Sequence, residues 1–495
     1  MGAVGRQVAA LAFEAQRELV GRLHLDVDVQ RQRDGQRVEA RSEVRRGGRS
    51  TGVHDPTVPS PSVEPTDRTI LRLAVPALAT LAVEPLYVLV DTAIVGHLGT
   101  APLAGVALAA GVLNVAFLVC NFLAYGTTAR VAFLVGAGDP QAADQVAVQG
   151  LWLSALLGLI AAALVGGLAR PAAVALGGSG AVLTNAITYL RISAIGTPFV
   201  LVALVGHGYL RGVQDTRTPL AIAVGANLLN VGVELVLVYG LDLGVAGSAW
   251  GTVLAQVVAA AVFLGVLTRR LRMSGASLAV DRGELLRLAR TGRHLFVRTA
   301  ALLTTLTLAT SVAARVDPPT LAGHQIALQI ETFLALTVDA LAIAGQALTG
   351  AALGAGDVRE ARRTGRRLVQ MGLRAGAALC IVVVATAWLL PHIFSGDPAV
   401  ISRASAALVI VGLMQLPAAV VFVLDGVLLG ASDTRFQQLS NVVALLAFLP
   451  FAAALLVWPR LGIIGIWTGL FAWMLARLLA NSRRFAGRRW QNVPA

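Results

Sequence analysis

The sequence has few charged residues, two cysteines and no lysine. Only 14% of its 495 residues are charged, whereas 56% are hydrophobic, and the mean hydropathy is +0.73. Soluble domains carry about 25% charged residues, so an ordinary water-soluble globular protein is excluded. Cys120 and Cys380 both lie in apolar stretches, which excludes a disulfide framework and a cysteine-based metal cluster.

All of the basic residues are arginines. Residues 70–495 hold 29 arginines against 17 acidic residues, and the whole chain has a net charge of +13. In such a hydrophobic chain an arginine excess marks cytoplasmic loops rather than a nucleic-acid-binding surface. We therefore expect membrane lipids, and no nucleic acid, among the partners of the protein.

The first 69 residues differ from the rest of the chain. They are rich in arginine, glutamine and aspartate, and proline recurs at positions 56, 59, 61 and 65. Because they lack the apolar content needed to fold, we predict that residues 1–69 form a disordered cytoplasmic tail. The first thirty residues contain no apolar core of a secretory signal, so none is expected.

The remaining sequence is a succession of apolar stretches. About 20 such residues cross a membrane as one helix. We therefore predict an all-α integral membrane protein with twelve transmembrane helices, near residues 70–96, 101–126, 142–169, 181–207, 218–240, 245–268, 285–314, 319–348, 366–391, 399–428, 436–458 and 461–481.

Arginines gather in every second connection between these stretches, which predicts their orientation. The odd-numbered connections are poor in arginine, and residues 97–102, 239–244 and 391–398 contain none. The even-numbered connections, and both termini, are therefore predicted to be cytoplasmic. The arginines concerned are Arg130; Arg211 and Arg217; Arg269, Arg270, Arg272, Arg282, Arg287, Arg290 and Arg293; Arg359, Arg362, Arg363, Arg366 and Arg367; and Arg483, Arg484, Arg488 and Arg489.

Four short motifs occur twice, and the second copy always begins 218 positions after the first, as at Leu103 and Leu321. Four matches at one spacing indicate two parallel copies, which is the plan of a secondary transporter with its substrate site between the halves. We predict two pseudo-symmetric six-helix lobes, residues 70–268 and 285–485, a cytoplasmic inter-lobe loop, residues 269–284, and a C-terminal tail, residues 486–495. The motifs are Leu-Ala-Gly, Gly-Ala-Gly-Asp, Asp-Thr-Arg and Gly-(Val/Ile)-(Ala/Ile)-Gly.

Ionisable residues inside apolar spans are costly and mark functional sites. In the first span Glu84 and Asp91 are seven residues apart, nearly two helical turns, and so share one face; we expect Pro85 to kink the helix beside them. Both are candidates for a carboxylate that takes up and releases a proton. A hydrated position near the helix end for Asp91, and a structural hydrogen bond for Glu84, are the alternatives.

The fifth span places Asn230 and Glu234 on one face, with Asn227 one turn earlier. An amide beside a carboxylate can hold a proton or a Na⁺ ion. Asp91, Asn230 and Glu234 are the residues expected to hold a transient Na⁺. Hydrogen bonding between helices is the alternative for these residues. His207, at the end of the fourth span, can titrate near neutral pH or serve as a packing residue.

Polar residues of the eighth span are candidates for the substrate cavity, with helix–helix hydrogen bonding as the alternative. We expect Arg298 of the seventh span to extend its charge towards the membrane surface. Asp215 and Asp433 each precede Thr-Arg at a predicted cytoplasmic turn and are expected to cap the helix that follows. The cavity candidates are Gln325, Gln329, Glu331, Asp339 and Gln346.

Longer motifs spread over both copies resemble the MATE (multidrug and toxic compound extrusion) family, and within it the DinF-like bacterial branch. The resemblance covers about residues 70–485. The motifs that carry it are Glu84-Pro85-Leu86-Tyr87 with Asp91-Thr92-Ala93; Gly208-Tyr209-Leu210-Arg211-Gly212; Leu321-Ala322-Gly323-His324-Gln325; Asp339-Ala340-Leu341-Ala342; and Leu424-Asp425-Gly426.

This resemblance implies an inner-membrane antiporter that exports amphipathic, often cationic organic compounds in exchange for H⁺ or Na⁺. It implies a transporter rather than an enzyme, with no cofactor, and we expect a monomer. Asp91 matches the family's first-helix aspartate, and Asn230 and Glu234 its fifth-helix pair, with Glu in place of the usual Asp. His207 stands where Asn is common in the family, and Glu331 is also unusual. These departures leave the identity of the coupling ion open, with H⁺ favoured over Na⁺.

An exporter of lipid-linked precursors or metabolites from the same superfamily is the alternative function. It would need a strongly cationic central cavity, whereas few arginines lie inside the predicted spans. A membrane enzyme would need a cluster of catalytic groups at an interface, and no such spacing occurs. A passive channel is disfavoured by the two-copy plan.

Overall fold

The computed structural model describes residues 67–492, and all regular elements in this range are helices. The predicted disordered tail, apart from its last three residues, lies outside the described range. Within residues 67–492, twelve helical spans are long and apolar enough to cross a membrane, which confirms the predicted fold class.

The spans follow one another with short connections, some of which contain further short helices. The spans are α2 (Asp67–Gly96), α3 (Thr100–Cys120) with α4 (Phe122–Gly136), α5 (Pro140–Gly167), α7 (Gly180–Gly212), α8 (Arg217–Leu235) with η1 (Val236–Gly240), α9 (Gly244–Ser274), α10 (Arg282–Val316), α11 (Pro318–Gly354), α12 (Val358–Thr386), α14 (Pro398–Gly430), α15 (Thr434–Val457) and α16 (Gly462–Ala486). The short helices are α6 (Ala169–Ala175), α13 (Pro391–Phe394), η2 (Pro459–Leu461) and η3 (Arg489–Asn492).

Several helices extend beyond the apolar stretches that predicted them. The second span continues to Gly136 rather than 126, and α12 begins at Val358 rather than 366. The polar extension of α12 is helical because Asp357 caps it, accepting a hydrogen bond of 2.8 Å from the backbone N–H of Glu360. Hydropathy detects only the apolar part of such a helix.

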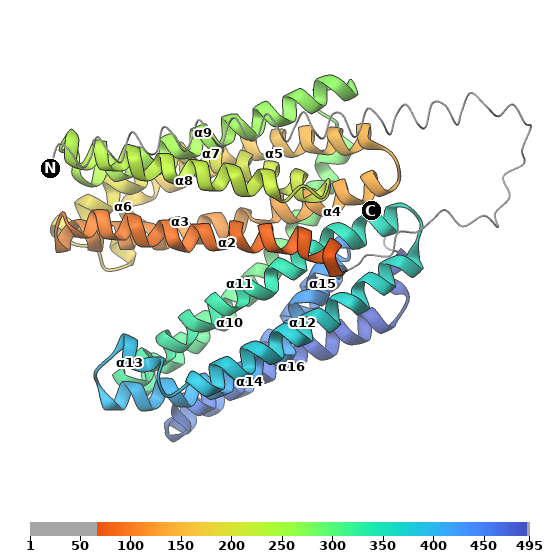
Figure 1. Ribbon diagram of the computed structural model, residues 1–495. Helices are drawn as coiled ribbons and strands as arrows, with labels where there is room; N and C mark the ends of the chain where they lie inside the picture. Colours follow the sequence, from red (N-terminus) through yellow and green to blue (C-terminus); the bar gives the residue numbers. More distant parts are fainter. Residues whose placement is uncertain (1–66, 493–495) are drawn as a thin grey trace, which may run out of the picture.

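The helices form two bundles, α2–α9 and α10–α16 (Figure 1). In the first bundle α7 packs against α4, α5 and α9; in the second, α14 packs against α11, α12 and α16. The two bundles approach each other where α4 and α11 end, and they diverge towards α6 and α13 (Figure 1).

The repeat seen in the sequence is also present in the helix packing. Gly208 of α7 lies so close to α4 that an added Cβ would be 2.7 Å from the carbonyl oxygen of Ala124. Gly426 and Ala342, each 218 positions later, make the same close approach between α14 and α11. Small residues permit such tight packing of membrane helices. The α4–α7 pair therefore recurs as the α11–α14 pair.

The two Asp-Thr-Arg turns differ in the structure. Asp215 caps α8 as predicted, accepting from the backbone N–H of Thr218 at 3.0 Å and from its hydroxyl at 2.7 Å. Asp433 makes no capping hydrogen bond, which corrects the prediction for the second copy. Its carboxylate instead accepts two hydrogen bonds from Arg484 of α16, because the charged guanidinium is the stronger donor.

Candidate ion-coupling and substrate sites

Asp91 lies inside the first bundle, between α2 and α9. Its side chain is only 7% exposed, and the hydroxyl of Ser248 donates a 2.9 Å hydrogen bond to its Oδ1 atom. Asp91 is one turn from the end of α2, yet it faces the interior rather than the surface. The alternative of a hydrated residue near the helix end therefore does not describe this carboxylate.

Glu234 and Asn230 of α8 are buried in the same bundle. Glu234 has an exposure of 0%, and neither of its carboxylate oxygens has a hydrogen-bond donor among the described residues. It lies against Gly251 of α9, whose missing side chain leaves room for it. The amide of Asn230 donates to the hydroxyl of Thr252 at 3.4 Å, which also bonds the Tyr87 hydroxyl at 2.9 Å.

The carboxylates of Asp91 and Glu234 lie within electrostatic reach of each other. Two buried negative charges without a neutralising partner are strongly unfavourable. The site therefore needs a bound proton or a small cation, which its carboxylate, amide and hydroxyl oxygens can accept. The helix also changes to a π-helical turn, η1, directly after Leu235, a local irregularity common at functional sites.

The other predicted coupling residues of the first bundle lie outside this cluster. Glu84 is exposed, although it shares a helix with Asp91, and Asn227 is half-buried. His207 lies near the end of α7, at the opposite end of the bundle from Asp91, and its ring packs against Phe263 with centroids 4.8 Å apart. The structure thus brings together Asp91, Asn230 and Glu234 but not these three.

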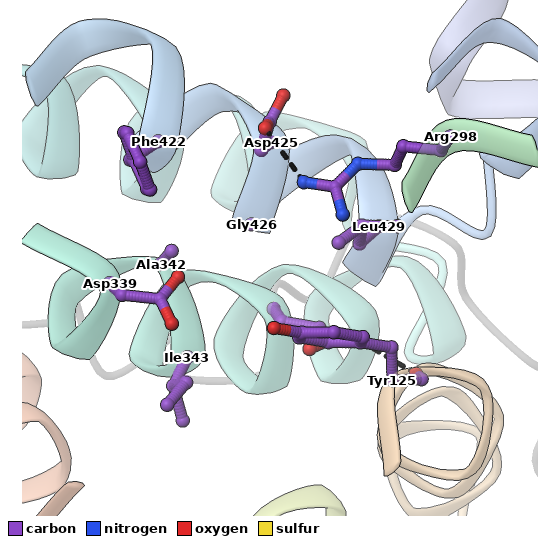
Figure 2. Close-up of a pocket in the computed structure, with 10 residues that line it drawn as sticks. Tyr125, Arg298, Asp339, Ala342, Ile343, Phe422, Asp425, Gly426 and Leu429 are labelled. Carbon is purple, nitrogen blue, oxygen red and sulfur yellow. Dashed lines mark hydrogen bonds and ion pairs between the residues drawn. The ribbon is translucent and has the colours of Figure 1, made fainter. Parts of the chain in front are cut away.

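The second bundle contains an ion-pair cluster at Asp425 of α14. Arg298 donates from Nη2 to Asp425 at 3.0 Å, so the prediction that Arg298 extends towards the membrane surface is wrong (Figure 2). Arg298 faces inward because a buried carboxylate on the facing helix offers it a charged partner. Asn481 of α16 donates to the other oxygen of Asp425 at 2.7 Å.

Sequence reasoning proposed no site role for Arg477 of α16, nor for Asp425 and Asn481. Arg477 is 1% exposed, donates to Asp425 at 2.6 Å, and stacks its guanidinium on the ring of Trp473 at 4.8 Å. The signal was present in the sequence, since Arg477 stands inside the last apolar stretch, where an arginine needs a partner.

A small cavity of about 20 Å³ lies beside this cluster and has room for about one water molecule. Asp339 and Gln346 of α11, two of the predicted cavity residues, line it together with Tyr125 and Phe422. Figure 2 shows Asp339, Tyr125 and Phe422 around it. Gln346 also donates a 2.7 Å hydrogen bond to the backbone carbonyl of Tyr125, which joins the second bundle to the first.

The other three predicted cavity residues lie elsewhere along α11. Glu331 accepts a 2.5 Å hydrogen bond from Gln415 of α14, which is the helix–helix arrangement given as the alternative. Gln325 and Gln329 are both exposed. Of the five predicted cavity residues, Asp339 and Gln346 are the two that line this cavity.

The MatE family profile matches residues 76–236 and 296–454, one copy in each bundle and most of the chain. The chain belongs to the MATE family. It is 34% identical over 442 residues to Protein DETOXIFICATION 44, chloroplastic, from Arabidopsis thaliana, covering 87% of this chain and 84% of the relative. It is 30% identical over 436 residues to DNA damage-inducible protein F from Escherichia coli, with 86% and 93% covered.

Solved MATE structures share the fold. A MATE transporter in complex with MaD3S superposes with a TM-score of 0.77 at 23% identity, covering 85% of this chain and 96% of the other. An outward-facing multidrug resistance MATE transporter superposes with the same TM-score, identity and coverage. The chain is thus a multi-pass membrane protein of a family of multidrug and toxic compound efflux transporters.

Proposed function

We propose that this MATE protein is a cation-coupled efflux antiporter that works by alternating access, with H⁺ rather than Na⁺ as the coupling ion. In this proposal the arginine-rich connections and both termini face the cytoplasm, and the protein resides in the inner (plasma) membrane. The observation that carries the coupling is the pair of buried carboxylates, Asp91 and Glu234.

The lack of donors at Glu234 supports a proton-carrying role. A carboxylate that is buried without donors is most stable in its protonated, neutral form, whereas one facing water is stable in its charged form. A movement that alternates the site between these surroundings makes it take up and release a proton. Coupling then follows if the two conformations differ in their affinity for the proton and for the substrate.

The arrangement of the two bundles supports alternating access. They meet at the end that bears the basic connections and diverge at the other end (Figure 1). In the proposed orientation this conformation opens outward. Rocking of the bundles about their contact would open the cytoplasmic end instead, as in other transporters built from two repeats.

We propose small amphipathic cations as substrates. The carboxylate of Asp339 and the aromatic rings of Tyr125 and Phe422 line the cavity in the second bundle, and both kinds of group attract organic cations. Arg298 also lines this cavity, but its charge is paired with Asp425. Since that cavity holds only about one water molecule in this conformation, it must widen for a substrate to bind.

An exporter of lipid-linked precursors remains the second candidate, because Arg298 and Arg477 are buried inside the spans. Both arginines, however, pair with Asp425, which neutralises part of their charge. Cation efflux is therefore the function that the described residues support better.

The test is transport in proteoliposomes containing the purified full chain, with the cationic dye ethidium as probe. An imposed pH gradient should drive dye movement, and Asp91→Asn should abolish it while the protein retains its wild-type thermal stability. Undiminished transport by Asp91→Asn would remove this carboxylate from the mechanism. A response to a sodium gradient but not to a pH gradient would replace H⁺ by Na⁺.

A further inference from the structure

A larger cavity, of about 400 Å³, lies between the two bundles at the end where they meet. Its walls come from three places: α4 of the first bundle, the first turns of α10, and the turn between α14 and α15 of the second bundle. The charged residues that line it are Arg130, Glu284, Arg287, Arg290, Asp433 and Arg435, four arginines against two acids.

Both acidic residues of this cavity are already engaged. Glu284 accepts from Arg130 at 2.9 Å and lies 3.5 Å from Arg287. Asp433 is held by Arg484, which lies outside the lining, through hydrogen bonds of 2.6 and 3.1 Å. Neither acid therefore neutralises the remaining arginines.

Arg290 and Arg435 line the cavity from α10 and α15 and form no ion pair with any residue in 67–492. α15 begins at this wall, and its N-cap residue Asp433 makes no side-chain hydrogen bond to the first backbone N–H groups of the helix. Positive-inside placement explains arginines on this face. It does not explain why Arg130 of the first bundle lines the same hollow as Arg290 and Arg435 of the second.

We infer that this cavity is a binding site for a phosphate-bearing anion, supplied either by a phospholipid headgroup or by a soluble phosphate compound. Guanidinium groups bind phosphate through paired, charge-assisted hydrogen bonds. An anion held between Arg130 of the first bundle and Arg435 of the second joins the two bundles at their contact. Binding therefore stabilises the conformation in which these ends lie together.

The experiment compares two double variants that lose the same charge. Arg290→Gln/Arg435→Gln removes the two unpaired arginines of the cavity. Arg272→Gln/Arg359→Gln removes two exposed arginines of the same basic end that do not line it. Each purified full-length protein is titrated with inorganic pyrophosphate at constant ionic strength, followed by thermal unfolding. Retention of phosphatidylglycerol against phosphatidylcholine is measured by native mass spectrometry.

A soluble phosphate ligand is indicated if pyrophosphate raises the unfolding temperature of the wild type and of the Arg272/Arg359 variant. A lipid headgroup is indicated if pyrophosphate has no effect but both proteins retain phosphatidylglycerol selectively. In either case the Arg290/Arg435 variant should bind about tenfold more weakly, the effect of about one charge-assisted bond. Equal loss in both variants, or no binding of either probe by the wild type, would overturn the proposal. Neither readout depends on transport.

Discussion

Gly136 and Gly354 occupy equivalent positions in the two repeats, 218 residues apart, and each packs against the backbone of the opposite bundle. A Cβ at Gly136 would overlap the carbonyl oxygen of Ala351, and one at Gly354 would overlap that of Phe133. Phe133 and Ala351 are themselves related by 218 positions. The contact between the bundles is therefore two-fold symmetric.

Substituting either glycine by alanine should separate the bundles at this contact. Because the obstructing atoms belong to the backbone, we expect a loss of about 1–3 kcal/mol in the free energy of unfolding, together with reduced transport. Thermal unfolding and dye efflux would measure both. Gly265→Ala is the control, since no atom lies within 4 Å of the added Cβ. If Gly136→Ala behaves like this control, the contact is not close in the membrane.

Replacing Arg477 by methionine should destabilise the second bundle by leaving Asp425 with fewer partners. Removing one partner of a buried ion pair costs about 3–5 kcal/mol, and we expect the lower end because Arg298 and Asn481 remain. The double variant Arg477→Met/Asp425→Asn should be less stable still in thermal unfolding, because it also removes the carboxylate partner of Arg298. Arg460→Met, at an exposed position, is the control. An unfolding temperature of Arg477→Met equal to that of this control would contradict the prediction.

The Asp317–Arg403 ion pair predicts a stability that depends on pH. Burial raises the pKa of Asp317, but hydrogen bonds from Arg403 and Thr320 outweigh it, so the pKa lies below its usual value. A lowered carboxylate pKa contributes stability above the pKa of the unfolded chain, and this contribution is lost as the pH falls through the folded value. The unfolding temperature should therefore fall less between pH 6 and pH 3 in Asp317→Asn than in wild type. Identical pH profiles would contradict this.

Glu234→Gln should separate coupling from folding. Glutamine has the same shape, and the buried carboxylate oxygens have no donors to lose, so thermal stability should be unchanged or higher. Transport driven by a pH gradient should fall to the level of liposomes without protein. Glu84→Gln is the matched variant, because Glu84 is exposed on α2 and should retain transport. The reverse result would move the coupling role to Glu84.

The sequence indicated some of the residues of the proposed coupling site, but not which of the candidates lie together. Asn230 and Glu234 were found together because residues four apart on a helix share a face. Glu84 and Asp91 satisfied the same periodicity, yet only Asp91 is buried. Which part of a helix face is covered depends on the neighbouring helices, and Ser248, which bonds Asp91, lies 157 residues away.

The ion-pair cluster of the second bundle could be predicted from the sequence even less well. Arg298 and Asp425 are 127 residues apart, and Arg477 and Asp425 are 52 apart. Each was visible as a polar residue in an apolar stretch, but no local pattern indicated that they meet. The prediction that Asp433 caps α15 was wrong for the same reason: its partner, Arg484, lies on another helix that no local pattern could indicate.

By itself, the sequence determined that this protein is an all-helical membrane protein with twelve spans and an internal repeat. Those properties depend on the length and order of apolar stretches, which a one-dimensional pattern records. Only the tertiary structure decided which polar groups face one another and where the bundles touch. Helices that are apolar on nearly every side carry little information about their own rotation, so packing against neighbours must settle it.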